Sequence, residues 1–185
     1  VVQVRFLRKR LEYHLMANHL FANAKALVFA GLFFDGREAE KWLKKGISIL
    51  KKEIPEQVLA DGENFERSPM YHCIILDDIL DLISIAGVYN HPLISKSIIS
   101  DWKSVIKKML NWLQAMCHGD NRIALFNDAA FGIAPQYHQL VDYAKKLGIE
   151  NPRVAVVTAN EKVSEKMPAT IDAALIAKMN DRHQI

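Results

Sequence analysis

Residues 68–86 read SPMYHCIILDDILDLISIA, and this stretch predicts a helix with a defined start. The oxygen of Ser68 can cap free backbone amides, and Pro69 fits the first helical position, where no amide donor is needed. One face of the helix is predicted to be buried through Ile75, Ile79, Leu82 and Ile83. Residues 90–92 (Asn-His-Pro) then break the chain.

Helical periodicity continues on both sides of this stretch. Apolar residues recur at helical spacing over 5–30, as one long helix or two short ones, and again over 37–52, where Pro55 is predicted to stop the helix. A further periodic helix runs from about Ile98 to near Gly119. Successive helices with one apolar stripe each predict helical hairpins stacked into a larger bundle or toroid, and therefore a mainly α fold.

The tail has a different character. Pro152 precedes the short β-branched run 154–157, and a helix-like stretch follows over about 169–179. We therefore expect a first domain over residues 1–146 and a short α/β-like tail over 147–185.

Composition excludes several classes of function. The net charge of +3 arises from 24 Lys and Arg against 21 Asp and Glu spread along the chain, so nucleic-acid binding is not indicated. Cys73 and Cys117 lack the short pair spacing of zinc and redox motifs, and no apolar run is long enough for a membrane span. Because the chain starts at Val1 without a signal-peptide core, we expect an upstream portion to be missing, which leaves the localisation unknown.

Four segments carry a resemblance to a known family: NHLFANAKAL (18–27), LADG (59–62), FERSPMYH (65–72) and ALFNDAAFG (124–132). Over about residues 5–135 the chain resembles the helical domain of the heparinase II/III family of polysaccharide lyases, which includes some alginate lyases. The resemblance implies a partial α/α toroid, a periplasmic or secreted location, and no cofactor or metal. It also implies an acidic polysaccharide substrate and a C-terminal β-sandwich domain, which we expect to lie outside these 185 residues.

The implied chemistry is β-elimination of a uronic-acid-containing polysaccharide. Removing the proton at carbon 5 of a uronate builds negative charge beside a carboxylate, which hydrogen-bond donors must first neutralise. The resemblance implies that Asn18 neutralises the carboxylate and that His19 assists or acts as base. It implies that Tyr71 donates the proton to the leaving oxygen, and it leaves the role of base open between Tyr71 and His19. Taken alone, an Asn-His pair is usually a surface or capping feature, and a lone tyrosine is more often a half-buried packing residue.

Four further residues are candidates for substrate binding: His72, Arg67, Asn127 and Asp128. The last two lie in a polar loop flanked by glycine and could line the sugar cleft. His72 follows Tyr71 in the first turn of the predicted helix. There, the positive end of the helix dipole and the nearby imidazole would both favour a negative phenolate oxygen.

Other charged groups are read as solvated faces. Asp77, Asp78 and Asp81 could suggest paired carboxylates for glycoside hydrolysis, but a solvent-exposed stripe is the simpler interpretation. A second exposed face, which could attract a polyanion, comprises Lys44, Lys45, Lys51 and Lys52.

The tail carries a separate resemblance. The segments 148–156, 161–163 and 166–174 resemble an internal piece of a phosphate acyltransferase of the phosphate butyryltransferase type. This favours a fusion of two fragments over coincidental similarity. Three hypotheses follow: a carbon-oxygen lyase module, a fragment of an acyl transferase, and a non-catalytic sugar-binding fragment.

Overall fold

The structure is a computed structural model that describes residues 1–15, 17–149, 171 and 174. The chain divides into two units, Val1–Pro152 and Arg153–Ile185, and the first unit holds nearly all the described residues. The predicted strand over 154–157 lies outside the described residues. Of the predicted tail helix, only Ile171 and Ala174 are described, and both are helical.

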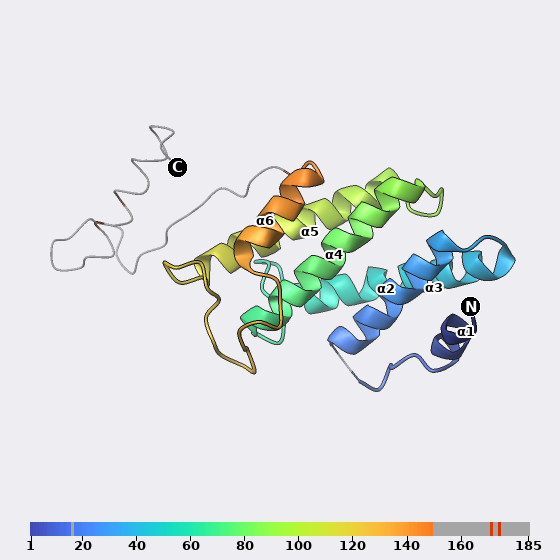
Figure 1. Cartoon of the computed structure of the whole chain (residues 1–185), viewed down its shortest axis with the longest axis horizontal. Helices are drawn as coiled ribbons and strands as arrows, with labels where there is room; N and C mark the ends of the chain where they lie inside the picture. The colour runs from blue at the N-terminus through green and yellow to red at the C-terminus, as the bar shows by residue number, and fades with distance from the viewer. Residues whose placement is uncertain (16, 150–170, 172–173, 175–185) are drawn as a thin grey trace. The chain divides into compact units, whose positions relative to one another are not determined.

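The described residues of the first unit form six helices: α1 (Val2–Lys9), α2 (Asn18–Phe33), α3 (Arg37–Gln57), α4 (Pro69–Tyr89), α5 (Lys96–Ala115) and α6 (Tyr137–Lys146). Helices α2 and α3 form one hairpin and α4 and α5 form the next, as Figure 1 shows. Helix α2 packs against α4, and α6 packs on α4 and α5. No strand forms among the described residues, so the predicted mainly α class is confirmed. None of the described helices is long and apolar enough to cross a membrane.

The start of α4 confirms the prediction from the Ser-Pro pair. The Ser68 side chain accepts a hydrogen bond from the backbone N–H of Tyr71, with an N to O distance of 3.5 Å, and Pro69 takes the first helical position. The helix ends at Asn90, which adopts the left-handed conformation. All four residues predicted for its buried face are buried: Ile75, Ile79, Leu82 and Ile83.

The sequence left open whether residues 5–30 form one long helix or two short ones, and the structure has two, α1 and α2. One predicted helix boundary is corrected. Helix α3 does not stop at Pro55 but continues to Gln57. A proline breaks a helix through its missing N–H and its clash with the preceding turn. Here Ile54 and Gln57 are buried on either side of the exposed Pro55, and the N–H of Val58 still donates to the Ile54 carbonyl at 2.9 Å. Packing of this last turn therefore outweighs the loss of one hydrogen bond.

The interpretation of Asp77, Asp78 and Asp81 on α4 as a solvent-exposed stripe is also corrected. Lys25 on α2 donates to Asp78 Oδ1 at 2.6 Å and to Asp81 Oδ2 at 2.5 Å, and all three side chains are at most one-third exposed. The hydroxyl of Tyr143 on α6 donates to the other oxygen of Asp81 at 2.9 Å. Burial alone would lower the pKa of the Lys25 ammonium, but its hydrogen bonds to the two carboxylates together raise it. These polar contacts join three helices.

The α2–α3 hairpin depends on close approach of the two backbones. A Cβ atom placed on Gly31 would lie 2.6 Å from the backbone nitrogen of Leu43 and 2.6 Å from its Cβ. At Gly46 an added Cβ would lie 2.8 Å from the carbonyl oxygen of Ala24. Backbone atoms cannot move aside without shifting a helix, so both positions require glycine.

We expect Gly31→Ala to lower the free energy of unfolding by about 1–3 kcal/mol, the usual range for overpacking a core. The loss should appear even though alanine has the higher helix propensity, because the new methyl group meets backbone atoms. Gly87→Ala is the matched control, since an added Cβ in this exposed part of α4 meets nothing within 4 Å. That control should be neutral or stabilise the fold by up to about 1 kcal/mol. Urea unfolding of the two variants measures the difference, and equal effects would contradict the close packing.

Candidate functional site

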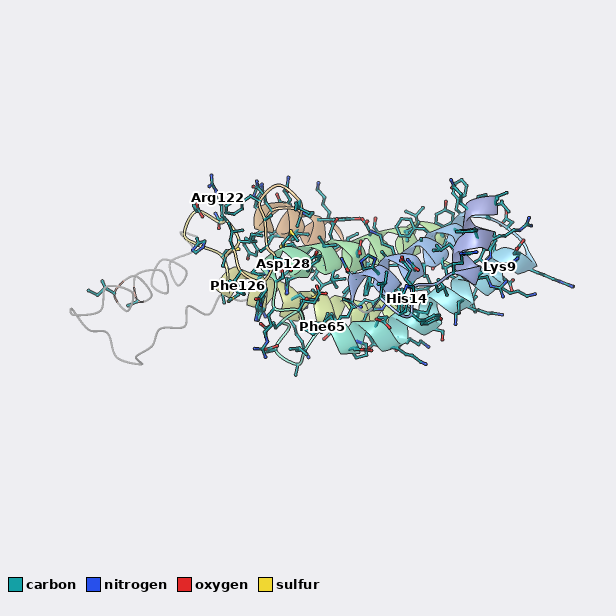
Figure 2. The ribbon with its side chains drawn as sticks, turned by 90° about the horizontal axis from the view of Figure 1, so that it is seen from below. Lys9, His14, Phe65, Arg122, Phe126 and Asp128 are labelled. Atoms are coloured by element: carbon teal, nitrogen blue, oxygen red, sulfur yellow. The ribbon has the colours of Figure 1, made fainter. Side chains whose placement is uncertain are left out.

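A depression of about 710 Å³ opens where the N-termini of α2 and α4 meet the loop before α6. Seven residues line it: Ala17, Asn18, His19, Glu66, Tyr71, Asn127 and Asp128. Figure 2 shows Asp128 and Phe65 toward one end of the helical unit and Lys9 at the other. Asn18 and Tyr71 thus lie at one concave surface.

Asn18 and His19 occupy the first turn of α2, and a strained residue precedes them. Ala17 has φ 72° and ψ −142°, a conformation that side chains disfavour. Its carbonyl accepts a hydrogen bond from Nε2 of Gln57 at 2.9 Å, and Gln57 is buried. No described side chain caps this end of α2, so its first backbone N–H groups are candidates for binding an anion.

The loop side of the depression is tied to the segment before α4. Nδ2 of Asn127 donates to the carbonyl oxygen of Arg67 at 3.1 Å and lies 3.5 Å from that of Glu66. Asn127, Asp128 and Arg67 all have positive φ, as does Ala17 across the depression. Such conformations cost on the order of 1–3 kcal/mol each and tend to gather at functional sites, which supports assigning a function to this surface.

Glu66 is a site residue that the sequence reasoning did not select. Its half-buried carboxyl group lines the depression, and burial raises its pKa, with the charge of Asp128 adding to the shift and that of His19 opposing it. The buried Asn64 accepts a hydrogen bond from the Glu66 N–H at 3.1 Å, which fixes the turn. Its place inside the segment 65–72, three residues before the helix start, was the available signal.

Two predicted substrate-binding residues lie elsewhere. Arg67 is exposed but is not among the residues that line the depression. His72 is 0% exposed, so the prediction that it binds substrate is wrong. Its Nε2 donates to the carbonyl oxygen of Met109 at 3.0 Å, and its ring stacks on Trp112 with centroids 4.7 Å apart. Adjacent residues of a helix point about 100° apart, so Tyr71 faces the depression while His72 faces α5.

Burial also changes the charge of His72. Removal from water lowers the pKa of the imidazole to about 4, although its hydrogen bond to Met109 opposes the shift. The ring is therefore neutral near pH 7 and supplies no positive charge to Tyr71, contrary to the expectation from sequence.

This shift predicts acid sensitivity. The unfolded chain binds a proton at His72 below about pH 6.5, whereas the folded chain does so only below about pH 4, so stability falls as the pH drops through this window. We expect a loss of about 3 kcal/mol from this residue between pH 7 and pH 4. Urea unfolding at several pH values measures it. In the variant His72→Gln this part of the fall in unfolding free energy with decreasing pH should be absent. The same pH dependence in the variant and the wild type would contradict the buried neutral imidazole.

The charges at the depression constrain any ligand. Among the described residues, its titratable lining residues are Glu66, Asp128, His19 and Tyr71, and no lysine or arginine lines it. Attraction for an anionic group must therefore come from Asn18, His19 and the free amides of α2. The lysine face of α3 is exposed as predicted, through Lys44, Lys45, Lys51 and Lys52. In the described part of the chain, no group of three or more His, Cys, Asp or Glu side chains could hold a metal ion.

Residues 2–148 match the family described as heparinase II/III N-terminus. The chain therefore belongs to the heparinase II/III family, in agreement with the resemblance seen in its sequence. The match extends a little beyond both ends of the region predicted from the motifs.

Several lyases are similar to this chain. The heparin-sulfate lyase of Bacteroides stercoris is 31% identical over 118 residues, which cover 63% of this chain and 17% of that protein. The crystal structure of a heparan sulfate lyase from Pedobacter heparinus is 28% identical and covers 68% of this chain and 19% of that one, with a TM-score of 0.55. A heparinase III structure at 24% identity and a TM-score of 0.62 shares the fold over 80% of this chain. The chain thus spans less than a quarter of these relatives.

A second group of relatives is similar to about a third of the chain, which is more than the predicted tail over 147–185 contains, so the similarity includes residues outside that tail. The phosphate butyryltransferase of Clostridium acetobutylicum is 40% identical over 72 residues, which cover 35% of this chain and 24% of that enzyme. The phosphate acetyltransferase of Thermotoga maritima is 42% identical over 71 residues. Both resemblances noted in the sequence are therefore found among known proteins. The division at residue 146 and the fusion of two fragments stay predictions, while the packed first unit includes the buried Ile149.

Proposed function

We propose that the depression is the helical side of a polysaccharide lyase site that cleaves a uronic-acid-containing polymer by β-elimination. The observation that carries this proposal is that Asn18, His19 and Tyr71 line one depression. These three side chains come from the starts of two helices that are far apart in the sequence.

Each side chain has a role in this chemistry. Asn18 and the free amides of α2 hydrogen-bond the uronate carboxylate, so negative charge can build on carbon 5 when its proton leaves. His19 lies beside Asn18 and either hydrogen-bonds the same carboxylate, in which case Tyr71 takes the carbon 5 proton, or takes that proton itself. Tyr71 gives its proton to the glycosidic oxygen as the bond to carbon 4 breaks and a double bond forms between carbons 4 and 5.

The substrate class follows from the relatives. Their names specify heparin sulfate or heparan sulfate, so a heparan-type polymer is the first substrate to test, with alginate as the alternative from the wider family. The chain spans only 17% of the first of these relatives, and we propose that the intact site needs a further domain, a β-sandwich by family resemblance. The depression by itself is open to water, and we expect the isolated chain to turn over substrate feebly.

The direct test follows the ultraviolet absorbance of the unsaturated uronate product. The chain is incubated with heparan sulfate, alginate and hyaluronan, alone and within a longer protein that carries it. We expect slow product formation by the chain on at least one polymer and faster formation by the longer protein. No product from either protein on any uronate polymer would refute the lyase proposal.

Acyl transfer between acyl-CoA and phosphate is a second candidate function, supported by the similarity of the tail to phosphate butyryltransferases. Release of thiol from butyryl-CoA in the presence of phosphate would support it. Binding of a polysaccharide with neither product would instead support a non-catalytic sugar-binding role.

A further inference from the structure

The loop between α1 and α2 folds back onto α2 through Glu12. The backbone N–H of Glu12 donates to Oδ1 of Asn23 at 3.1 Å, and Nδ2 of Asn23 donates to Oε2 of Glu12 at 2.9 Å. Asn23 is only 9% exposed. This reciprocal pair uses both ends of a buried amide and holds the Glu12 carboxylate in one place.

The same carboxylate oxygen reaches the candidate site. Oε2 of Glu12 lies 3.8 Å from Nδ1 of His19, whose side chain is 56% exposed. His19 and Asn23 are four positions apart on α2, so they share one face of the helix and Glu12 spans both. This distance is longer than a hydrogen bond, and a rotation of the exposed imidazole toward Glu12 would be needed to form one.

We propose that Glu12 is a positioning residue for His19. A carboxylate next to one ring nitrogen favours the tautomer that carries its hydrogen there, and the other nitrogen then holds a lone pair. Glu12 therefore keeps the hydrogen on Nδ1 and leaves Nε2 as a proton acceptor. For catalysis this inference rests on the proposed lyase function, where it assigns His19 to accepting a proton. The tautomer itself does not depend on that function.

The surroundings of His19 favour this assignment. The other carboxyl groups of the depression, Glu66 and Asp128, come from different segments, and neither forms an ion pair with His19 among the described residues. Only Glu12 is held by a buried side chain while it contacts the ring. An asparagine at position 23 is thus explained, since a leucine there would pack but could not orient Glu12.

The test is a nitrogen-15 spectrum of the histidine ring nitrogens in the 185-residue chain, at a pH where the His19 ring is neutral. The variant His19→Gln identifies its signals. We expect the wild type to favour the form with hydrogen on Nδ1. In Glu12→Ala the ratio of this form to the Nε2–H form should fall about 2-fold to 5-fold, the low end of the usual net contribution of one hydrogen bond. Glu12→Gln, which can still accept the hydrogen bond from Asn23, should cause a smaller fall in this ratio. This second variant tests the proposal if the alanine variant does not fold.

Glu40→Ala is the matched control, because Glu40 is an exposed carboxylate at the same 3.8 Å distance from a cation, Lys44. It should leave the His19 signals unchanged. A ring that stays in one tautomer in Glu12→Ala overturns the proposal. If the tautomer shifts but no uronate polymer is cleaved, Glu12 still positions His19 and only the lyase function fails. In a lyase-active protein, Glu12→Ala should lower kcat more than it changes KM.

Discussion

Tyr71→Phe, in a complete enzyme that carries this segment, should lower kcat by about 100-fold to 10,000-fold, the usual contribution of a general acid or base. The hydroxyl is the group that would protonate the leaving glycosidic oxygen, and phenylalanine cannot replace it. Tyr71 lines the depression and is half-buried, so its ring should continue to pack after the substitution. Steady-state kinetics on a heparan-type polymer measure the change.

The fold should survive Tyr71→Phe nearly intact. The Ser68 cap of α4 uses the backbone N–H of Tyr71, which the substitution preserves. Tyr89→Phe is the matched control, because it makes the same change at the exposed far end of the same helix. That control should keep full turnover. Near-normal turnover of Tyr71→Phe would instead mean that Tyr71 is a packing residue and that the proposed mechanism is wrong.

Asn18→Ala in the same enzyme should slow turnover by about 100-fold to 1,000-fold, as is typical when one donor to a developing negative charge is lost. Asn18 lines the depression from the start of α2, where the described residues provide no side-chain cap for the first backbone amides. Without it, the uronate carboxylate stays partly unneutralised and opposes removal of the carbon 5 proton. Progress curves at saturating substrate give the loss in kcat.

Binding should be affected less than turnover by Asn18→Ala, because the lost interaction strengthens mainly in the transition state. Asn111→Ala is a suitable control, since Asn111 is an exposed asparagine on α5 outside the depression. A large rise in KM with unchanged kcat would show that Asn18 binds the polymer without assisting the elimination.

Local signals in the sequence predicted the helices well. The Ser68-Pro69 pair located the start of α4, and the spacing of its apolar residues identified the buried face. These features depend on neighbouring residues alone, so they can be read without the tertiary structure. Pro55 shows the limit of local reasoning, because the packing of Ile54 and Gln57 keeps α3 intact for one more half-turn.

The sequence by itself determined the helical class, the family resemblance and the candidates Asn18, His19 and Tyr71. Only the tertiary structure showed that these side chains line one depression together with Glu66, and that Glu12 contacts His19. It also decided that His72 is buried, because the side of α4 that carries it is the side covered by α5. Helix positions follow from local backbone preferences, whereas the orientation of each side chain depends on which helices pack around it.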